Sequence, residues 1–216
     1  MKPVNVILAD DHRIVRKGLK AILEHEDDID VVAEAENGRE AVEVCKLIKP
    51  DVVLLDISMP GMNGLLATDE ILESSPETKV LILSMYLDET YITEALRKGA
   101  CGYLLKDCAT GELVAAIKSV MRGETYLSPK VTTRVVKQFI NTKKGVVETV
   151  FEVLSSRELQ ILQLIAEGKT TKCISEILAL SPKTIDSHRV NIGRKLDLHD
   201  IASLVKFAIR TGISEA

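Results

Sequence analysis

Several features common in exported and membrane proteins are missing from this sequence. No apolar run reaches the roughly 18 residues that a membrane-spanning helix requires. The first apolar run ends at Asp10-Asp11, which makes it too short for the core of a signal peptide. The cysteines contain no CxxC pair and no framework typical of disulfides; they are Cys45, Cys101, Cys108 and Cys173. These absences exclude a membrane partner and predict a reduced, cytoplasmic protein.

An excess of basic charge is also missing. The net charge is −4, and that value taken alone argues against nucleic-acid binding. The charge is unevenly distributed: residues 1–126 carry 23 acidic and 14 basic side chains, residues 127–147 carry five basic and no acidic ones, and residues 148–216 carry nine of each. A chain of 216 residues, 46% of them hydrophobic, is long enough for two folded domains. The sequence therefore predicts two different domains, of which the first is acidic.

The first part of the chain alternates short apolar runs with amphipathic stretches. The runs are Val4–Ala9, Ile29–Ala35, Val52–Leu55, Val80–Leu83 and Tyr103–Leu105. Their unbroken apolar character is typical of strands that are buried on both faces of a parallel sheet. Five such strands alternating with five helices predict a doubly wound α/β domain with a five-stranded parallel sheet.

A basic helix is expected next. Ser128-Pro129 matches a helix N-cap followed by proline at the first helical position, which predicts a helix to about Ile140. We expect residues 123–147 to form a linker that contains this helix. Beyond Leu154 four short amphipathic stretches follow, and they predict an all-α helix-turn-helix domain over residues 148–216.

Polar side chains follow the predicted strands of the first domain. Asp10 and Asp11 come after the first strand, Asp56 ends the third, Ser84 ends the fourth and Lys106 follows the fifth. All lie at the carboxyl edge, where open α/β sheets bind ligands. Three neighbouring carboxylates repel one another, and a hard cation such as Mg²⁺ relieves that repulsion. With a lysine beside them, they predict phosphoryl transfer to a carboxylate.

Four segments, ILADDH, VVLLDISMPGMNG, LILS and GYLLKD, resemble the receiver domain of bacterial response regulators, a flavodoxin-like fold, over residues 1–122. The resemblance implies that Asp56 accepts a phosphoryl group from a histidine kinase. It implies that Mg²⁺ is held by Asp10, Asp11, Asp56 and the backbone carbonyl of Ser58. The resemblance also implies that Ser84, Tyr103 and Lys106 contact the phosphoryl group or respond to it.

The helical part contains LSSRELQILQLIAEGKTTKCISEILALSPKTIDSHRVNIGRKL, which resembles the LuxR-type output domain. The whole chain thus resembles a response regulator of the NarL subfamily. Such a protein is a phosphorylation-controlled transcription regulator that dimerises and binds promoter DNA, and it is not an enzyme beyond its own phosphotransfer. RNA polymerase is a further candidate partner.

The third predicted helix of this domain has the character of a recognition helix. Ile185 and Ile192 share its apolar face, while Lys183 lies in the first turn, where a cation reaches phosphate. Ser187 and Val190 are placed to read base edges in the major groove. The residues expected to contact DNA are Lys183, Thr184, Asp186, Ser187, His188, Arg189, Val190, Arg194 and Lys195.

The last helix offers an apolar stripe with two interpretations. The stripe consists of Ile201, Leu204, Val205 and Ala208. It either pairs two copies of the chain, since a domain of zero net charge binds DNA weakly as a monomer, or packs on the other three helices.

The chain departs from the family pattern at several positions. Asp107 follows the lysine where many receivers carry proline, Cys173 replaces an acidic residue, Gly193 falls inside the recognition helix, and Asp197 stands where a glycine usually ends that helix. Two other functions remain open at this point: hydrolysis of phosphate esters at the carboxylates, and binding of a protein or RNA by the helical domain.

Overall fold

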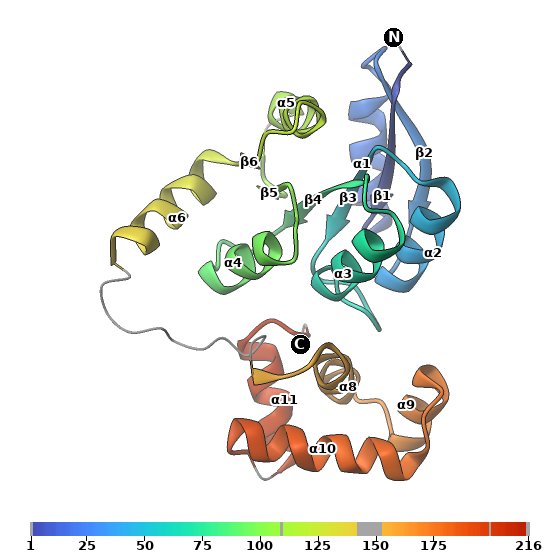
Figure 1. The fold of residues 1–216 in the computed structure, drawn as a ribbon, viewed down its shortest axis with the longest axis vertical. Coiled ribbons are helices and arrows are strands. Elements are labelled where there is room, and N and C mark those ends of the chain that lie inside the picture. The colour runs from blue at the N-terminus through green and yellow to red at the C-terminus, as the bar shows by residue number, and fades with distance from the viewer. Residues whose placement is uncertain (1, 109, 142–152, 199, 215–216) are drawn as a thin grey trace. The chain divides into compact units, whose positions relative to one another are not determined.

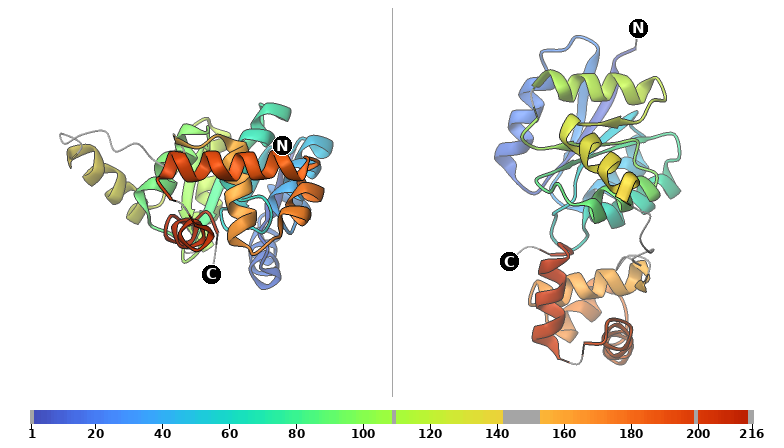
Figure 2. Two further views of the ribbon diagram at one scale, coloured as in Figure 1. Left: turned by 90° about the horizontal axis from the view of Figure 1, so that it is seen from below. Right: turned by 90° about the vertical axis from the view of Figure 1, so that its left-hand side faces the viewer.

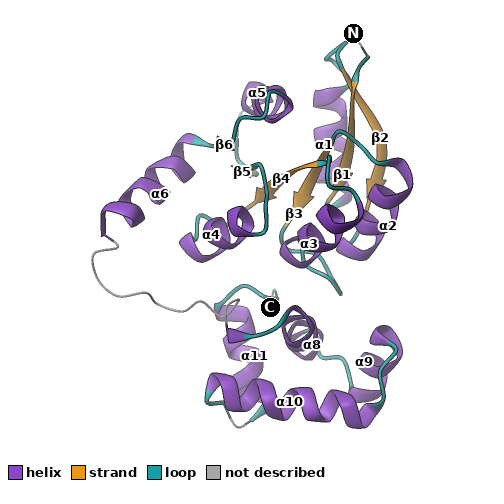
Figure 3. Cartoon of the chain, viewed as in Figure 1, coloured by secondary structure: helices purple, strands orange, loops and turns teal. Residues whose placement is uncertain are grey.

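A parallel sheet forms the centre of the first of two units into which the chain divides (Figures 1 and 3). The computed structural model describes residues 2–108, 110–141, 153–198 and 200–214. The strands are β1 (Val4–Ala9), β2 (Ile29–Ala35), β3 (Val52–Asp56), β4 (Lys79–Ser84), β5 (Gly102–Leu105) and β6 (Tyr126–Leu127). Their order is β2-β1-β3-β4-β5-β6, and every pairing is parallel.

Helices cover both faces of this sheet. They are α1 (Arg13–Leu23), α2 (Gly38–Ile48), α3 (Gly64–Ser74), α4 (Glu89–Arg97), α5 (Thr110–Met121) and α6 (Pro129–Asn141). Leu23 of α1 and Ile117 of α5 share one buried cluster with Val6 and Leu54, so α1 and α5 cover the same face. Helices α2, α3 and α4 cover the other (Figure 1). The predicted doubly wound fold is confirmed.

The sixth strand was not predicted. Tyr126 and Leu127 pair with Gly102 and Tyr103 of β5, so the sheet extends one strand beyond the five expected. A Cβ atom at position 102 would lie 2.5 Å from the Tyr126 carbonyl oxygen, so the glycine allows this close approach. A strand of only two residues leaves no periodic pattern in the sequence.

The predicted basic helix also belongs to the first unit. Helix α6 starts at Pro129, as expected, and contacts α4, where the Arg134 Nε atom lies 2.8 Å from Glu89 Oε1. Residues 126–141, which the sequence analysis placed in a linker over 123–147, lie within the first unit.

The described residues of the second unit form four helices, as predicted: α8 (Ser156–Ala166), α9 (Thr171–Leu178), α10 (Pro182–Leu196) and α11 (Ile201–Arg210). Ser155 caps α8 in a capping box with Glu158, and Ser181 caps α10. Helix α11 runs across the direction of α10 (Figure 2). The shared core contains Leu159, Leu162, Ile174, Ile185, Ile192, Leu204 and Ala208.

All four cysteines are free, as expected from their spacing. Among the described residues, no helix combines the length and apolar character that crossing a bilayer requires.

The turn between α9 and α10 contains an alanine in an unfavourable conformation. Ala179 ends α9 with φ 51° and ψ 41°, which is the left-handed region. The Leu180 N–H donates to the Ser175 carbonyl at 3.1 Å and closes the turn. A Cβ atom costs about 1 kcal/mol in this region, and glycine avoids that cost.

Ala179→Gly is therefore expected to raise the free energy of unfolding of the second unit by about 1 kcal/mol. The exposed Ala202, in α11, provides the matched control, because the same substitution in a helix lowers stability by up to about 1 kcal/mol. Native-state hydrogen exchange of the buried amides of α8, in the full chain, measures both effects. A loss of protection in Ala179→Gly equal to that in Ala202→Gly would contradict the left-handed assignment.

Candidate functional site

Three side chains predicted to meet at the carboxyl edge of the sheet do converge there. Asp10 follows β1, Asp56 ends β3 and Lys106 follows β5. The Lys106 Nζ atom lies 2.8 Å from Asp10 Oδ2 and 2.7 Å from Asp56 Oδ2. Both carboxylates are buried, each with 2% of its surface exposed. Two buried anions thus share one cation.

Asp11 and His12 complete an acidic cluster with the two buried carboxylates. One ligand atom from each of Asp10, Asp11, His12 and Asp56 lies within 4.8 Å of the others. Within the described residues, neither Asp10 Oδ2 nor Asp56 Oδ2 accepts a hydrogen bond of good geometry, although the Lys106 ammonium is close. Buried carboxylate oxygens with spare acceptor capacity suit a hard cation, so this donor set fits Mg²⁺.

His12 is a member of the cluster that the sequence analysis did not assign. Its Nδ1 atom lies 2.7 Å from Asp11 Oδ1, and its backbone N–H donates to Asp10 Oδ1 at 2.8 Å. The only feature of the sequence that could have indicated His12 is its position directly after the two aspartates.

The pKa of Asp56 reflects this environment. Burial raises it to about 6, the cation of Lys106 opposes the rise, and the charge of Asp10 adds to it. Burial alone would lower the pKa of Lys106, but the carboxylates of Asp56 and Asp10 outweigh burial and raise it. Because the folded state holds the Asp56 proton more tightly than the unfolded chain does, this group reduces stability as the pH rises from about 4 to 6.

A glycine folds the loop after β3 back over the end of that strand. A Cβ atom at Gly64 would lie 2.0 Å from the Asp56 carbonyl oxygen, and the Gly64 N–H donates to the Ile57 carbonyl at 2.9 Å. Only glycine fits here, which explains its place in the MPGMNG segment. Ser58 lies in this loop, half-buried and two residues beyond Asp56.

Ser84 and Tyr103 are both connected to Tyr86 in the loop after β4. Ser84 is fully buried at the end of β4, and its Oγ atom accepts the Tyr86 N–H at 3.0 Å. The Tyr103 side chain is also fully buried, and its hydroxyl donates to the Tyr86 carbonyl at 2.8 Å. The Tyr86 ring stacks on Tyr91 with 5.5 Å between centroids. Tyr86 is therefore a link that the sequence did not reveal.

Helix α10 of the second unit presents one exposed stripe. Lys183, Ser187, Val190 and Arg194 are exposed at helical spacing, and Val190 has 69% of its surface accessible. Ile185 and Ile192 are buried, as predicted. The stripe carries two cations, a hydroxyl and an apolar group, a combination suited to phosphates and base edges.

Other side chains of α10 make contacts within the unit. The Lys195 Nζ atom lies 2.7 Å from Oε2 of the buried Glu158, so its charge is compensated inside the fold. The Arg189 Nη2 atom lies 3.7 Å from Asp186 Oδ1. His188 and Thr184 are half-buried.

Packing explains one of the two departures near the end of α10, and the other keeps the backbone conformation of the family pattern. A Cβ atom at Gly193 would lie 2.6 Å from the Leu198 carbonyl oxygen, so glycine permits the turn toward α11. Asp197 ends the helix with φ 54° and ψ 43°, the conformation usually taken by glycine at this position.

The interpretation of the α11 stripe as a pairing surface is wrong for two of its members. Leu204 and Ala208 have 3% and 0% of their surfaces exposed, because α11 packs on α8. Val205 is half-buried, and only Ile201 of this stripe is exposed.

Comparison with known proteins decides the family. The model of the response regulator receiver domain matches residues 6–118, and the model of bacterial regulatory proteins of the luxR family matches residues 152–208. The chain belongs to the response regulators with a LuxR-type DNA-binding domain. This response regulator is a member of a family of transcription regulators rather than of enzymes, so phosphate-ester hydrolysis is no longer a competing function.

Relatives match this response regulator over nearly its full length. The oxygen regulatory protein NreC of Staphylococcus haemolyticus is 45% identical over 211 residues, covering 96% of this chain and 97% of the relative. RcsB of Salmonella typhimurium is similar in structure, with a TM-score of 0.68, 26% identity and coverage of 98% and 99%. A structure of two RcsB dimers bound to two parallel DNAs matches with a TM-score of 0.60, 26% identity and coverage of 95% and 98%.

The electrostatics of the acidic site predict how Asp56 titrates. In magnesium-free protein, the side-chain carboxyl ¹³C resonance of Asp56 is expected to titrate with an apparent pKa of about 6. Lys106→Met should raise this pKa further, because it removes the cation that favours the ionised form. Lys130→Met, which removes an exposed cation from α6, should leave it unchanged. A value near 4 in both the native protein and Lys106→Met would refute the role given to burial.

Proposed function

We propose that Asp56 accepts a phosphoryl group from a histidine kinase and that this modification controls binding to promoter DNA. The observation that carries the proposal is the buried Asp56 carboxylate in contact with Lys106, beside Asp10 and Asp11, in a chain of this family. The free cysteines are compatible with action in the cytoplasm.

Each residue of the acidic site has a proposed task. A carboxylate oxygen of Asp56 attacks the phosphorus atom of the kinase phosphohistidine, the P–N bond breaks, and the imidazole of the kinase leaves. The Lys106 ammonium, 2.7 Å from Asp56 Oδ2, moves to the transferred oxygens. Mg²⁺, when bound, supplies positive charge to the phosphoryl oxygens. Asp10, Asp11, Asp56 and the Ser58 carbonyl would hold it. Because burial alone favours the protonated form of Asp56, these cations also keep the nucleophile ionised.

The signal leaves this site through Ser84 and Tyr103. We assign to the Ser84 hydroxyl a new bond to the phosphoryl group; its Oγ atom rotates to form this bond and no longer accepts the Tyr86 N–H. Since the Tyr86 carbonyl accepts the Tyr103 hydroxyl, this change reaches Tyr103 and the loop before α4 together.

The exposed stripe of α10 would enter the major groove. Lys183 and Arg194 are placed to contact phosphates, and Ser187 and Val190 to read bases. Ser187 Oγ donates to the Lys183 carbonyl at 3.0 Å, so toward DNA it acts as an acceptor, which suits the amino groups of adenine and cytosine. Equal numbers of acidic and basic residues over 148–216 favour binding by a dimer, and DNA-bound RcsB dimers support the same arrangement here.

Replacement of the acceptor tests the first part of the proposal. Asp56→Asn is expected to abolish Mg²⁺-dependent labelling by acetyl phosphate, because the amide is a far weaker nucleophile than the carboxylate. Phos-tag electrophoresis or intact-mass analysis measures the labelling. Asp107→Asn, which alters an exposed carboxylate beside Lys106, is the control and should be labelled like the native protein. Undiminished labelling of Asp56→Asn would exclude Asp56 as the acceptor.

Two substitutions on α10 test the docking of this helix. Lys183→Ala should weaken binding to all duplexes alike and reduce the salt slope by about one, because it removes one phosphate contact. Ser187→Ala should cost about 1–2 kcal/mol on particular base pairs only. Lys206→Ala removes an exposed lysine of α11 and should leave the salt slope unchanged. Binding titrations over site variants and salt concentrations separate these effects. If Ser187→Ala weakens every duplex equally while Lys183→Ala alters base preference, the helix docks differently.

A further inference from the structure

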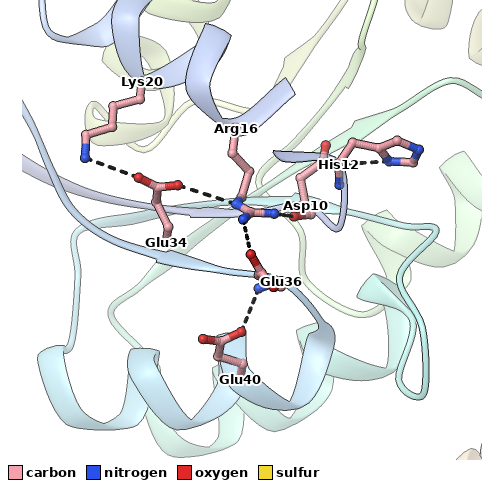
Figure 4. Close-up of polar contacts among 7 residues, drawn as sticks. All are labelled: Asp10, His12, Arg16, Lys20, Glu34, Glu36 and Glu40. Atoms are coloured by element: carbon pink, nitrogen blue, oxygen red, sulfur yellow. Dashed lines mark hydrogen bonds and ion pairs between the residues drawn. The ribbon is translucent and has the colours of Figure 1, made fainter. Parts of the chain in front are cut away.

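A buried arginine lies directly behind the acidic site (Figure 4). Arg16, on α1, has only 4% of its surface exposed. Its Nη1 atom donates to the Asp10 backbone carbonyl at 2.6 Å, and its Nη2 atom pairs with Glu36 Oε1. The Nε atom lies 3.4 Å from Glu34 Oε2. Arg16 thus joins the loop after β1 to the end of β2.

The two glutamates compensate the charge of this guanidinium. A buried cation without partners is strongly unfavourable, and Glu34 and Glu36 provide the opposite charge. Lys20 shares Glu34, with 3.2 Å between Lys20 Nζ and Glu34 Oε1. The contact with the Asp10 carbonyl is therefore not needed for charge balance. Its effect is to fix the direction of a backbone group.

Three contacts hold Asp10 in place, and Arg16 provides one of them. The backbone N–H of Asp10 donates to the Ala35 carbonyl at 3.2 Å, and its carbonyl accepts Arg16. Its Oδ1 atom accepts the His12 N–H at 2.8 Å. The remaining atom, Oδ2, faces Lys106 at 2.8 Å. Each constraint leaves Oδ2 fewer positions, so the carboxylate is fixed in orientation before any ligand arrives.

We propose that Arg16 is a positioning residue for magnesium binding, acting through the backbone of Asp10 without touching the ion. This inference rests on the proposed function, because it takes the acidic cluster as the metal site. Groups that orient metal ligands from outside typically alter affinity by 10–100-fold when they are replaced. Arg16 has the contacts expected of such a group, since it holds the loop that carries both Asp10 and Asp11.

The positioning role and simple electrostatics predict opposite changes in Mg²⁺ affinity when Arg16 is replaced. Arg16→Met removes a positive charge close to an acidic site, and charge alone would then tighten binding of a cation. Positioning instead predicts weaker binding, by about 10-fold or more. Lys20→Met is the matched control, because it removes a cation that also pairs with Glu34 but does not contact Asp10. Its affinity for Mg²⁺ should stay within about twofold of the native value.

Isothermal titration calorimetry with MgCl₂ on the full chain measures these affinities, and circular dichroism verifies folding of each variant. Arg16→Lys is included because it keeps the charge but loses the fork that reaches both Asp10 and Glu36, and it should bind Mg²⁺ more weakly than Lys20→Met. If Arg16→Met does not fold, the comparison of Arg16→Lys with Lys20→Met decides the question. Equal affinity of the folded Arg16 variant and Lys20→Met would overturn the positioning role.

The native protein and Asp11→Ala separate this inference from the proposed function. If the native protein binds no Mg²⁺, or if Asp11→Ala binds it as tightly, the metal site itself is wrong and the Arg16 role is overturned with it. If Asp11→Ala weakens binding while the folded Arg16 variants do not, only the positioning role fails.

Discussion

The Lys106 ammonium lies between two buried carboxylates, and the arrangement of the first unit depends on this contact. Asp10 and Asp56 would repel one another without it, because little solvent reaches them to screen their charges. The three residues come from the ends of β1, β3 and β5, so one cation connects the carboxyl ends of three separate strands. The apolar strands beneath make this possible, since burial on both faces leaves the edge as the place where charged groups gather.

A second cation, Arg16, contacts Asp10 on the side away from Lys106. Lys106 contacts the side chain of Asp10, and Arg16 contacts its backbone carbonyl. The two contacts differ in what can change them: a phosphoryl group would compete for Lys106, whereas Arg16 is enclosed by Glu34 and Glu36 on the far side of the backbone. The Lys106 contact can therefore change on phosphorylation, whereas the Arg16 contact stays in place. Phosphorylation can then move Lys106 while Arg16 keeps the Asp10 backbone in place, so the change stays confined to the groups that transmit the signal.

Much of the sheet and of the acidic site at its carboxyl edge could be predicted from the sequence. Four consecutive apolar residues at Val52–Leu55 indicate a strand buried on both faces, and an aspartate directly after them must lie at the edge. Contacts between segments distant in the sequence could not be predicted. Nothing in the local pattern shows that Lys195 pairs with Glu158. The α11 stripe was ambiguous for the same reason: an apolar face looks alike whether it packs on α8 or on a second chain. The two-residue β6 was too short to leave a signal.

Strand β6 has a consequence for how the protein resists aggregation. It covers the edge of β5, a strand with no exposed residue, and it is too short to act as a template for another chain. The opposite edge is β2, a longer strand, and it bears the exposed Asp30 and the half-buried Glu34. Charges on an edge strand make edge-to-edge pairing of two molecules unfavourable. The sheet thus ends in a short strand on one side and a charged strand on the other, and neither border favours growth into an extended assembly.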